Sequence, residues 1–359
     1  MKRRKTVQKL IVITIIVIAF LIIFFAYALQ DQPAQVAPGV DFFPNQTTQN
    51  QEQVRAVETR FMLDTYATIA IYHDIYNSEI TQLFEDVFYL ITELENLMSK
   101  TIKNSDIHRI NHSSGEPTAV DFRTIEVILS AMEFGEMSNG LFDITVGRLS
   151  YLWDFDEVIV IPEQAELLDA LDTVNFRQIS ILGNTVTLEG AKTWIDLGGI
   201  AKGFIADQVA NFLIENGVTS AMIDLGGDIR LIGAGGGENP WRIAIRDPFA
   251  GGENFAAIIE VSDAAVVSSG TYERRFEIDG ITYHHILDPR TGFPSQSDVV
   301  SATVIAQSGI VGEGLSTIAI LVGSKAFTEI LESHPEFIGA IIILNSGEII
   351  EIGNVRIVG

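Results

Sequence analysis

Hydrophobic and polar positions follow two different spacings along the chain, and each spacing predicts a different element. Residues 66–72 alternate and are rich in β-forming side chains, which is the pattern of a half-buried strand. Residues 78–98 instead place apolar side chains three and four positions apart, as on one face of a helix. Further helices are predicted at 123–138, 200–216 and 312–333.

Short β-rich runs lie between and after these helices. They are predicted as strands at 185–189, 219–224, 228–232, 241–246, 256–261, 265–268, 275–278, 299–306 and 339–345. Because strands and helices do not alternate strictly, the sequence favours an α+β fold with largely antiparallel strands and packed helices.

One run differs from these patterns because it is apolar throughout. Residues 10–29 contain no charged side chain. As a helix this run would span roughly 30 Å, so it predicts one N-terminal transmembrane helix. Five basic and no acidic residues lie in the first thirty positions, which orients the N-terminus toward the cytoplasm. A cleaved signal peptide is the alternative, since Ala26-Tyr27-Ala28 fits a small-x-small cleavage site. The length of the run favours the uncleaved anchor, and both interpretations place the rest of the chain outside the cytoplasm.

The sequence therefore divides into three parts. Residues 1–30 are predicted as a membrane anchor or signal segment. Residues 31–56 are rich in Gln, Pro and Asn and are predicted as a flexible linker. Residues 57–359 form the predicted globular domain, so we expect a single-pass protein of the cell membrane whose main domain is extracytoplasmic.

Charge and cysteine content exclude several classes of function. The 359 residues include 47 acidic and 23 basic side chains, for a formal net charge of −24. Nucleic-acid-binding proteins usually present a basic face, so this charge argues against a nucleic-acid partner. The chain has no cysteine, which excludes disulfides, thiolate zinc sites, cysteine nucleophiles and iron–sulfur clusters.

A glycine-rich turn precedes the helix predicted at 200–216. In Ile195-Asp196-Leu197-Gly198-Gly199-Ile200-Ala201-Lys202-Gly203, an acid is followed by two glycines and then by a lysine. Glycines let a ligand approach the backbone closely, and a helix N-terminus offers unpaired N–H groups to a phosphate. The segment therefore predicts an anion-binding turn beside Asp196, with Lys202 adding a full positive charge. An ordinary tight turn with a surface lysine is the alternative.

Three other polar segments carry weaker signals. The loop from His284 to Pro294 holds two of the six histidines, but adjacent histidines do not share a face, so they do not predict a metal site. Ser268 and Ser269 lack the G-x-S-x-G turn of serine hydrolases. The second Asp-Leu-Gly-Gly, at 224–227, lacks the context of a dinucleotide-binding fingerprint and is predicted as a hairpin turn.

Glu313 and Thr317 lie near the start of the helix predicted at 312–333. Being four residues apart, they share one face of that helix. A carboxylate and a hydroxyl are both oxygen ligands, which suits a hard ion such as Mg²⁺. Alternatively, Glu313 only stabilises the start of the helix, where an acidic side chain is favoured.

Taken in order along residues 60–356, these motifs resemble those of the ApbE family of FAD:protein FMN transferases. The segments that carry the resemblance are Met62-Leu63-Asp64-Thr65, Gly140 to Gly147, Leu152-Trp153-Asp154-Phe155, Asp196 to Gly203, Gly226-Gly227-Asp228, Ser269-Gly270-Thr271-Tyr272, His285 to Gly292 and Leu315-Ser316-Thr317. No single motif is decisive, but so many in the same order are specific.

The resemblance implies an ApbE-like flavin transferase fold for residues 57–359 and a Mg²⁺-dependent reaction. FAD is the substrate, its pyrophosphate is cleaved, AMP leaves, and FMN is esterified to a threonine or serine of a target protein. The acceptor would be an exported or membrane redox protein. Two alternatives keep the same site, namely hydrolysis of FAD to FMN and AMP, and membrane-tethered flavin binding without catalysis.

The resemblance also assigns residues. The implied magnesium ligands are the Gly199 carbonyl, the Glu313 carboxylate and the Thr317 hydroxyl. The implied FAD contacts are Leu63, Thr101, Phe142, Asp143, Ile144, Asp196, Lys202 and His285. Glu313 and Asp196 are the expected catalytic residues.

Three positions depart from the family pattern. The family usually has Asp at the position of Glu313, Gly at the position of Asp64, and often a flavin-packing tyrosine at the position of Thr101. The extra methylene of Glu313 moves its carboxylate, and Mg²⁺ is strict about geometry. Glu313 is left with two possible roles, as a metal ligand and as the base for the acceptor hydroxyl.

Overall fold

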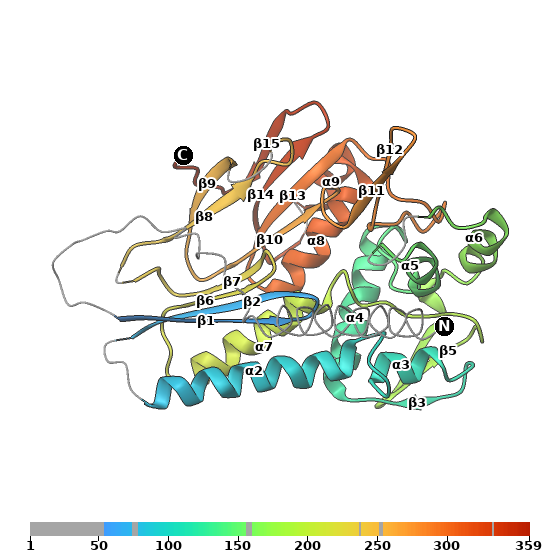
Figure 1. Ribbon diagram of the computed structural model, residues 1–359, viewed down its shortest axis with the longest axis horizontal. Coiled ribbons are helices and arrows are strands. Elements are labelled where there is room, and N and C mark those ends of the chain that lie inside the picture. Colours follow the sequence, from blue (N-terminus) through green and yellow to red (C-terminus); the bar gives the residue numbers. More distant parts are fainter. Residues whose placement is uncertain (1–53, 74–77, 156–159, 237, 251–253, 332–333) are drawn as a thin grey trace, which may run out of the picture. The chain divides into compact units, whose positions relative to one another are not determined.

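The computed structural model describes residues 54–73, 78–155, 160–236, 238–250, 254–331 and 334–359 (Figure 1). Within them the chain forms an α+β fold in which the paired strands run antiparallel. The predicted transmembrane helix lies outside the described residues. None of the helices that are described is long and apolar enough to cross a membrane.

Eight strands form the large sheet, in the spatial order β1-β2-β6-β7-β10-β13-β14-β15 (Figure 1). Their bounds are β1 Val54–Met62, β2 Thr65–His73, β6 Ala221–Leu225, β7 Asp228–Ile232, β10 Ala265–Gly270, β13 Val299–Ala306, β14 Phe337–Leu344 and β15 Ile349–Gly353. All residues of β13 are buried, which fits its place inside the sheet and confirms the strand predicted at 299–306.

Strand β1 begins earlier than the predicted domain. Residues 54–56 were expected to end the flexible linker, and they belong to this strand instead. The strand escapes a pattern-based prediction because polar Glu58 and Arg60 point toward helix α2, while Val57 and Phe61 are exposed on the other face.

Three helices, α2 (Ser78–Met98), α7 (Ala201–Glu215) and α8 (Gly309–Val322), form a layer that packs on one face of the large sheet. Helix α2 contacts α7, α7 contacts α8, and α8 packs on β10 and β13. Figure 1 shows α2 and α7 running along the β1–β2 edge, with α8 beside β10 and β13. Helix α2 confirms the prediction for 78–98, whose apolar spacing supplies the face that is buried here.

The prediction of one helix over 312–333 is wrong. Helix α8 ends at Gly323, whose φ of 82° is not helical, and a second helix, α9 (Ser324–Leu331), begins directly after it. The carboxylate of Asp298 accepts a hydrogen bond of 2.9 Å from the Ser324 N–H, which caps the start of α9.

The opposite face of the sheet carries a hairpin of β8 (Trp241–Arg246) and β9 (Phe255–Val261). Trp241 is buried, and its ring meets that of Tyr72 edge-on at 5.6 Å between centroids. The remaining elements are α3 Asp106–Asn111, β3 Thr118–Ala119, α4 Phe122–Met137, α5 Gly147–Trp153, α6 Gln164–Leu171, the 3₁₀ turn Phe176–Gln178, β4 Ile179–Leu182, β5 Thr185–Leu188, β11 Arg275–Ile278 and β12 Ile281–His284.

Candidate functional site

Two tight turns of the large sheet touch at one end of β2 and β6. Leu63 and Asp64 connect β1 to β2, and both have positive φ (56° and 57°), as a two-residue hairpin turn requires. Aspartate tolerates this conformation better than most residues, which accounts for Asp64 in place of a glycine. Gly226, in the β6–β7 turn, would place a Cβ atom only 2.2 Å from the Thr65 hydroxyl oxygen, so a side chain there would separate the turns.

Helices α7 and α8 cross with their backbones in contact beside these turns. A Cβ atom at Gly203 would lie 2.3 Å from the carbonyl oxygen of Gly309. This close approach lets the Gly203 N–H donate a 2.7 Å hydrogen bond to Oε2 of Glu313, across the two helices. The crossing therefore brings the first turn of α7 and the carboxylate of Glu313 into one site.

Lys202 lies between two buried carboxylates at this crossing. Its ammonium group pairs with Oδ2 of Asp228 and lies 3.2 Å from Oε1 of Glu313. Both acidic side chains are 4 % exposed, against 31 % for Lys202. Burial alone would lower the pKa of Lys202, but the two neighbouring carboxylates outweigh it and raise that pKa. Burial raises the pKa of both Asp228 and Glu313, and the charge of Lys202 opposes that rise.

Further acidic groups surround this cluster. Asp224 and Glu273 both have pKa values that burial raises, and both feel the charges of Lys202 and Asp228. Arg246 and Arg274 also act on Glu273, so three basic groups face the four acidic ones and the acids remain in excess. A divalent cation would offset such an excess.

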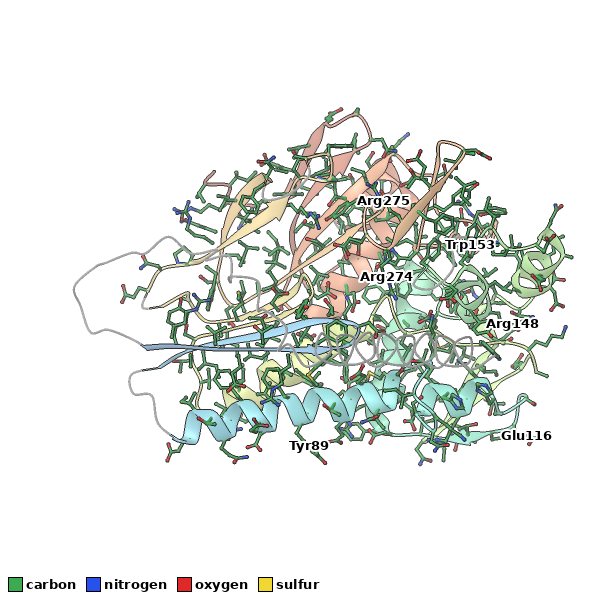
Figure 2. The ribbon with its side chains drawn as sticks, in the orientation of Figure 1. Tyr89, Glu116, Arg148, Trp153, Arg274 and Arg275 are labelled. Carbon is green, nitrogen blue, oxygen red and sulfur yellow. The ribbon has the colours of Figure 1, made fainter. Side chains whose placement is uncertain are left out.

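The loop predicted around His285 reaches the same cluster. Burial lowers the pKa of His285 to about 4, with further contributions from Arg274 (labelled in Figure 2), His284, and Lys202. The Nδ1 atom of His285 is buried and has no hydrogen-bond partner among the described residues. A neutral imidazole with an unpartnered, buried ring nitrogen therefore lies within electrostatic reach of Lys202.

Asp196 lies at the other end of the glycine turn and has partners of its own. One carboxylate oxygen accepts hydrogen bonds from Lys100 Nζ and from the Ser150 hydroxyl, each at 2.6 Å. The other accepts from the Gly198 N–H at 2.9 Å. Burial would raise the pKa of Asp196, but the Lys100 ammonium and these hydrogen bonds lower it. Thr101, next to Lys100, is exposed at the surface.

The predicted contacts Phe142, Asp143 and Ile144 support this turn from inside the protein. The ring of Phe142 is buried and would lie 3.8 Å from a Cβ atom at Gly199. Asp143 accepts hydrogen bonds from Thr145 and from the Phe176 N–H, although burial raises its pKa. The Ile144 carbonyl accepts from the Asp196 N–H at 2.8 Å. These interactions hold the Asp196 turn in place, and direct contact of the three residues with FAD stays a prediction.

The predicted magnesium ligands lie around the helix crossing. A Cβ atom at Gly199 would be 3.8 Å from the Thr317 hydroxyl oxygen, which also lies 3.4 Å from the Ser269 hydroxyl. In the part of the chain that the structure describes, no group of three or more His, Asp and Glu side chains is arranged to hold a metal. The set of Gly199, Glu313 and Thr317 includes only one such side chain. Its oxygen-only donors fit Mg²⁺, which usually takes one or two carboxylates and keeps several waters.

Several residues of the site were not predicted from the sequence. Asp228 belongs to the matched segment Gly226-Gly227-Asp228, but the sequence assigned it no function. Lys100 and Ser150 have no motif of their own, and only the fold shows that both bind Asp196. Glu273 was not predicted either, although it directly follows the matched segment that ends at Tyr272, and that position is the signal that could have indicated it.

Comparisons with known sequences identify the family of this chain. Residues 63–342 match the sequence profile of the ApbE family. A Treponema pallidum protein named FAD:protein FMN transferase is 33 % identical over 292 residues, covering 76 % of this chain and 80 % of that protein. A Vibrio cholerae protein of the same name is 36 % identical over 249 residues, covering 68 % and 75 %.

Comparisons with solved structures give the same fold. The flavin transferase ApbE of Vibrio cholerae matches with a TM-score of 0.75 and 30 % identity, over 85 % of this chain and 98 % of that one. The ApbE protein of Thermotoga maritima matches with a TM-score of 0.75 and 31 % identity, over 83 % and 97 %. The ApbE-like α+β fold expected from the sequence is thereby confirmed for the globular domain.

Proposed function

This chain belongs to the ApbE family, and we propose that it is a Mg²⁺-dependent FAD:protein FMN transferase that acts outside the cytoplasm. In the reaction, the bond between the FMN phosphorus and the bridging pyrophosphate oxygen breaks, and AMP leaves with that oxygen. The phosphorus bonds to the hydroxyl oxygen of a threonine or serine on an acceptor protein. The proton of that hydroxyl passes to a base.

The position of Lys202 is the observation that supports this proposal most directly. Its ammonium group stands in the first turn of α7, where backbone N–H groups and the helix dipole favour an anion. The side chain is partly exposed, so a pyrophosphate can approach it from solvent. Its ion pairs with buried Asp228 and Glu313 fix the position of the ammonium group. His285, on the neighbouring loop, can donate or accept a hydrogen bond at the same substrate.

The negative charge of the site supports the requirement for magnesium. Gly199, Glu313 and Thr317 would hold the ion through a carbonyl, a carboxylate and a hydroxyl oxygen. When bound, Mg²⁺ offsets the charge of the pyrophosphate and stabilises charge that develops during transfer. Both Glu313 oxygens already accept hydrogen bonds, from Lys202 and from the Gly203 N–H, and these bonds fix the direction in which the carboxylate points.

The surroundings of the three carboxylates support an assignment of the proton-transfer role. Asp228 is buried beside Lys202, and burial raises its pKa, as suits a general base. Asp196 is a weaker base, because Lys100 and its hydrogen-bond donors lower its pKa. We assign Asp196, in its ionised form, to holding the substrate-binding turn, and proton acceptance to Asp228, which is not among the proposed metal ligands.

Mass measurement of an acceptor protein tests the proposal. The purified full-length chain is incubated with FAD, Mg²⁺ and an exported redox protein that bears a surface threonine. A mass gain of one FMN on the acceptor supports transfer. Release of free FMN without that gain would indicate hydrolysis instead, and intact FAD would indicate a binding protein.

Two variants test the assignment of the metal ligands. Glu313→Gln and Thr317→Val should each abolish the metal-dependent turnover, because the first removes the carboxylate charge and the second removes the hydroxyl ligand. Thr328→Val in α9 is the matched control, since its hydroxyl only bonds the Ser324 carbonyl of its own helix. Rates equal to wild type in both site variants would refute the metal assignment.

A further inference from the structure

Two large aromatic side chains are exposed next to the site on the β1–β2 hairpin. Phe61 and Tyr66 are cross-strand partners, and their rings meet edge-on at 5.6 Å between centroids. Each is 67 % exposed. Aromatic rings normally bury most of their area, so a paired and exposed set next to a reaction site indicates a binding surface.

The strand register places these rings on the same face of the sheet as one acid of the site. Side chains two apart on a strand share a face, so Tyr66 and Thr68 lie on one side of β2. Thr68 pairs with Asp224 on the neighbouring strand. Asp224 in turn accepts a hydrogen bond from the Gly227 N–H and feels the charges of Lys202 and Asp228. Asp224 therefore shares the face of the exposed rings, whereas Lys202, Asp228 and Glu313 lie on the opposite face, which the helices cover. The rings and the site meet around the Leu63–Asp64 turn.

The helical layer does not cover this face. On the other side of β1, Arg60 pairs with Glu85 of α2 and stacks 4.1 Å above the ring of Phe88. Val57 and Thr59 alternate with these positions and extend the exposed face along the strand, with Val57 44 % exposed. We call the set Val57, Thr59, Phe61 and Tyr66 the hairpin stripe.

We propose that the hairpin stripe is the surface on which the acceptor protein docks. The inference rests on the proposed function, because a surface for an acceptor protein is needed only if the chain transfers FMN to a protein. The stripe ends at the Leu63–Asp64 turn, and the next residue, Thr65, touches Gly226 of the site. A folded acceptor that covers Phe61 and Tyr66 would bring its hydroxyl to Lys202 around this turn, because Lys202 belongs to the helical layer on the opposite face.

The chemistry of the stripe defines the partner that it fits. Aromatic residues dominate the binding energy of protein interfaces when a partner buries them. Exposed Asp64 borders the stripe at the turn, and the chain as a whole carries an excess of negative charge. The acceptor is therefore a protein with an apolar patch beside its target threonine and basic side chains at the rim of that patch.

Kinetics with a protein acceptor test the docking surface. The acceptor is the exported redox protein that the wild-type chain modifies in the mass assay. In the double variant Phe61→Thr/Tyr66→Thr, threonine keeps the strand propensity but removes both rings. The KM for the acceptor should rise about tenfold or more, as expected for the loss of two interface anchors. The kcat and the dissociation constant of FAD should remain those of wild type.

Two controls separate docking from a structural effect. Tyr89 is 72 % exposed and projects from α2 on the side away from the sheet (Figure 2), so Tyr89→Ala should leave all three constants unchanged. Tyr66→Phe keeps the ring and should keep the wild-type KM. An unchanged KM in the double variant, or a rise in KM that comes with weaker FAD binding and a lower Tm, would overturn the docking surface alone. Absence of transfer by the wild-type chain would overturn the proposed function and the docking surface together.

Discussion

The contact between α7 and α8 should not tolerate a single added methyl group. In Gly203→Ala, the new Cβ atom would lie 2.3 Å from the carbonyl oxygen of Gly309 and 2.8 Å from the backbone nitrogen of Ile310. Ordinary contacts of a Cβ atom are 3.4–4 Å. These neighbours are backbone atoms that cannot rotate away, so the two helices must move apart.

The cost of this movement follows from three effects. Overpacking a well-packed contact costs about 1–3 kcal/mol. Separation of the helices also breaks the hydrogen bond from the Gly203 N–H to the Glu313 carboxylate, and bonds to charged groups contribute about 1.5–3 kcal/mol. Alanine recovers about 1 kcal/mol through its higher helix propensity. The free energy of unfolding should therefore fall by about 1.5–5 kcal/mol, and FMN transfer should fall with it because Glu313 moves away from Lys202.

Urea-induced unfolding, followed by tryptophan fluorescence, measures the change in stability. Asn211→Ala is the control, because Asn211 is exposed on the same helix and its replacement should change stability by no more than about 0.5 kcal/mol. An unfolding midpoint and transfer rate equal to wild type in Gly203→Ala would refute the close contact and its role in positioning Glu313.

Two further predictions concern carboxylates with shifted pKa values. Asp207 accepts hydrogen bonds from the Gly309 and Ile310 N–H groups, and burial raises its pKa from 3.8 to about 6. Its contribution to stability is therefore fully present below about pH 4 and is lost as the pH rises through about 6. Asp207→Asn should flatten the pH dependence of the urea midpoint over this range, and a wild-type profile would assign that dependence to another group. Lys100→Met removes the ammonium that lowers the pKa of Asp196, so the acid limb of the transfer rate should move to higher pH. An acid limb at its wild-type position would show that the charge of Asp196 does not limit transfer.

The long, strongly patterned elements were predictable from the sequence. Helix α2 and strand β13 have the predicted bounds, because the amphipathic spacing of one and the continuous apolar run of the other match how they are buried. Short elements such as α3 and α6 were missed, because one or two turns hold too few apolar positions to show a period. The break at Gly323 was visible as a glycine, but only the cap from Asp298 makes it the start of a new helix.

The residue types of the site were predictable, but their partners were not. Lys202 and Glu313 each stood in a segment whose chemistry was apparent. Their direct contact depends on the backbone crossing of Gly203 and Gly309, which no local pattern reveals. Asp143 shows the converse. A matched motif placed it among the FAD contacts, whereas the fold surrounds it with hydrogen-bond donors of the chain itself.

The pairing of β2 with β6 has a consequence for how the protein acquires its ligand. It joins Ala67 to Leu225, and only this pairing brings Thr65 against Gly226. Contacts between such distant parts of a chain require the closure of a long loop, which slows folding. If FAD binds at these turns as proposed, its surface exists only once this loop is closed, and FAD would stabilise the folded protein by mass action.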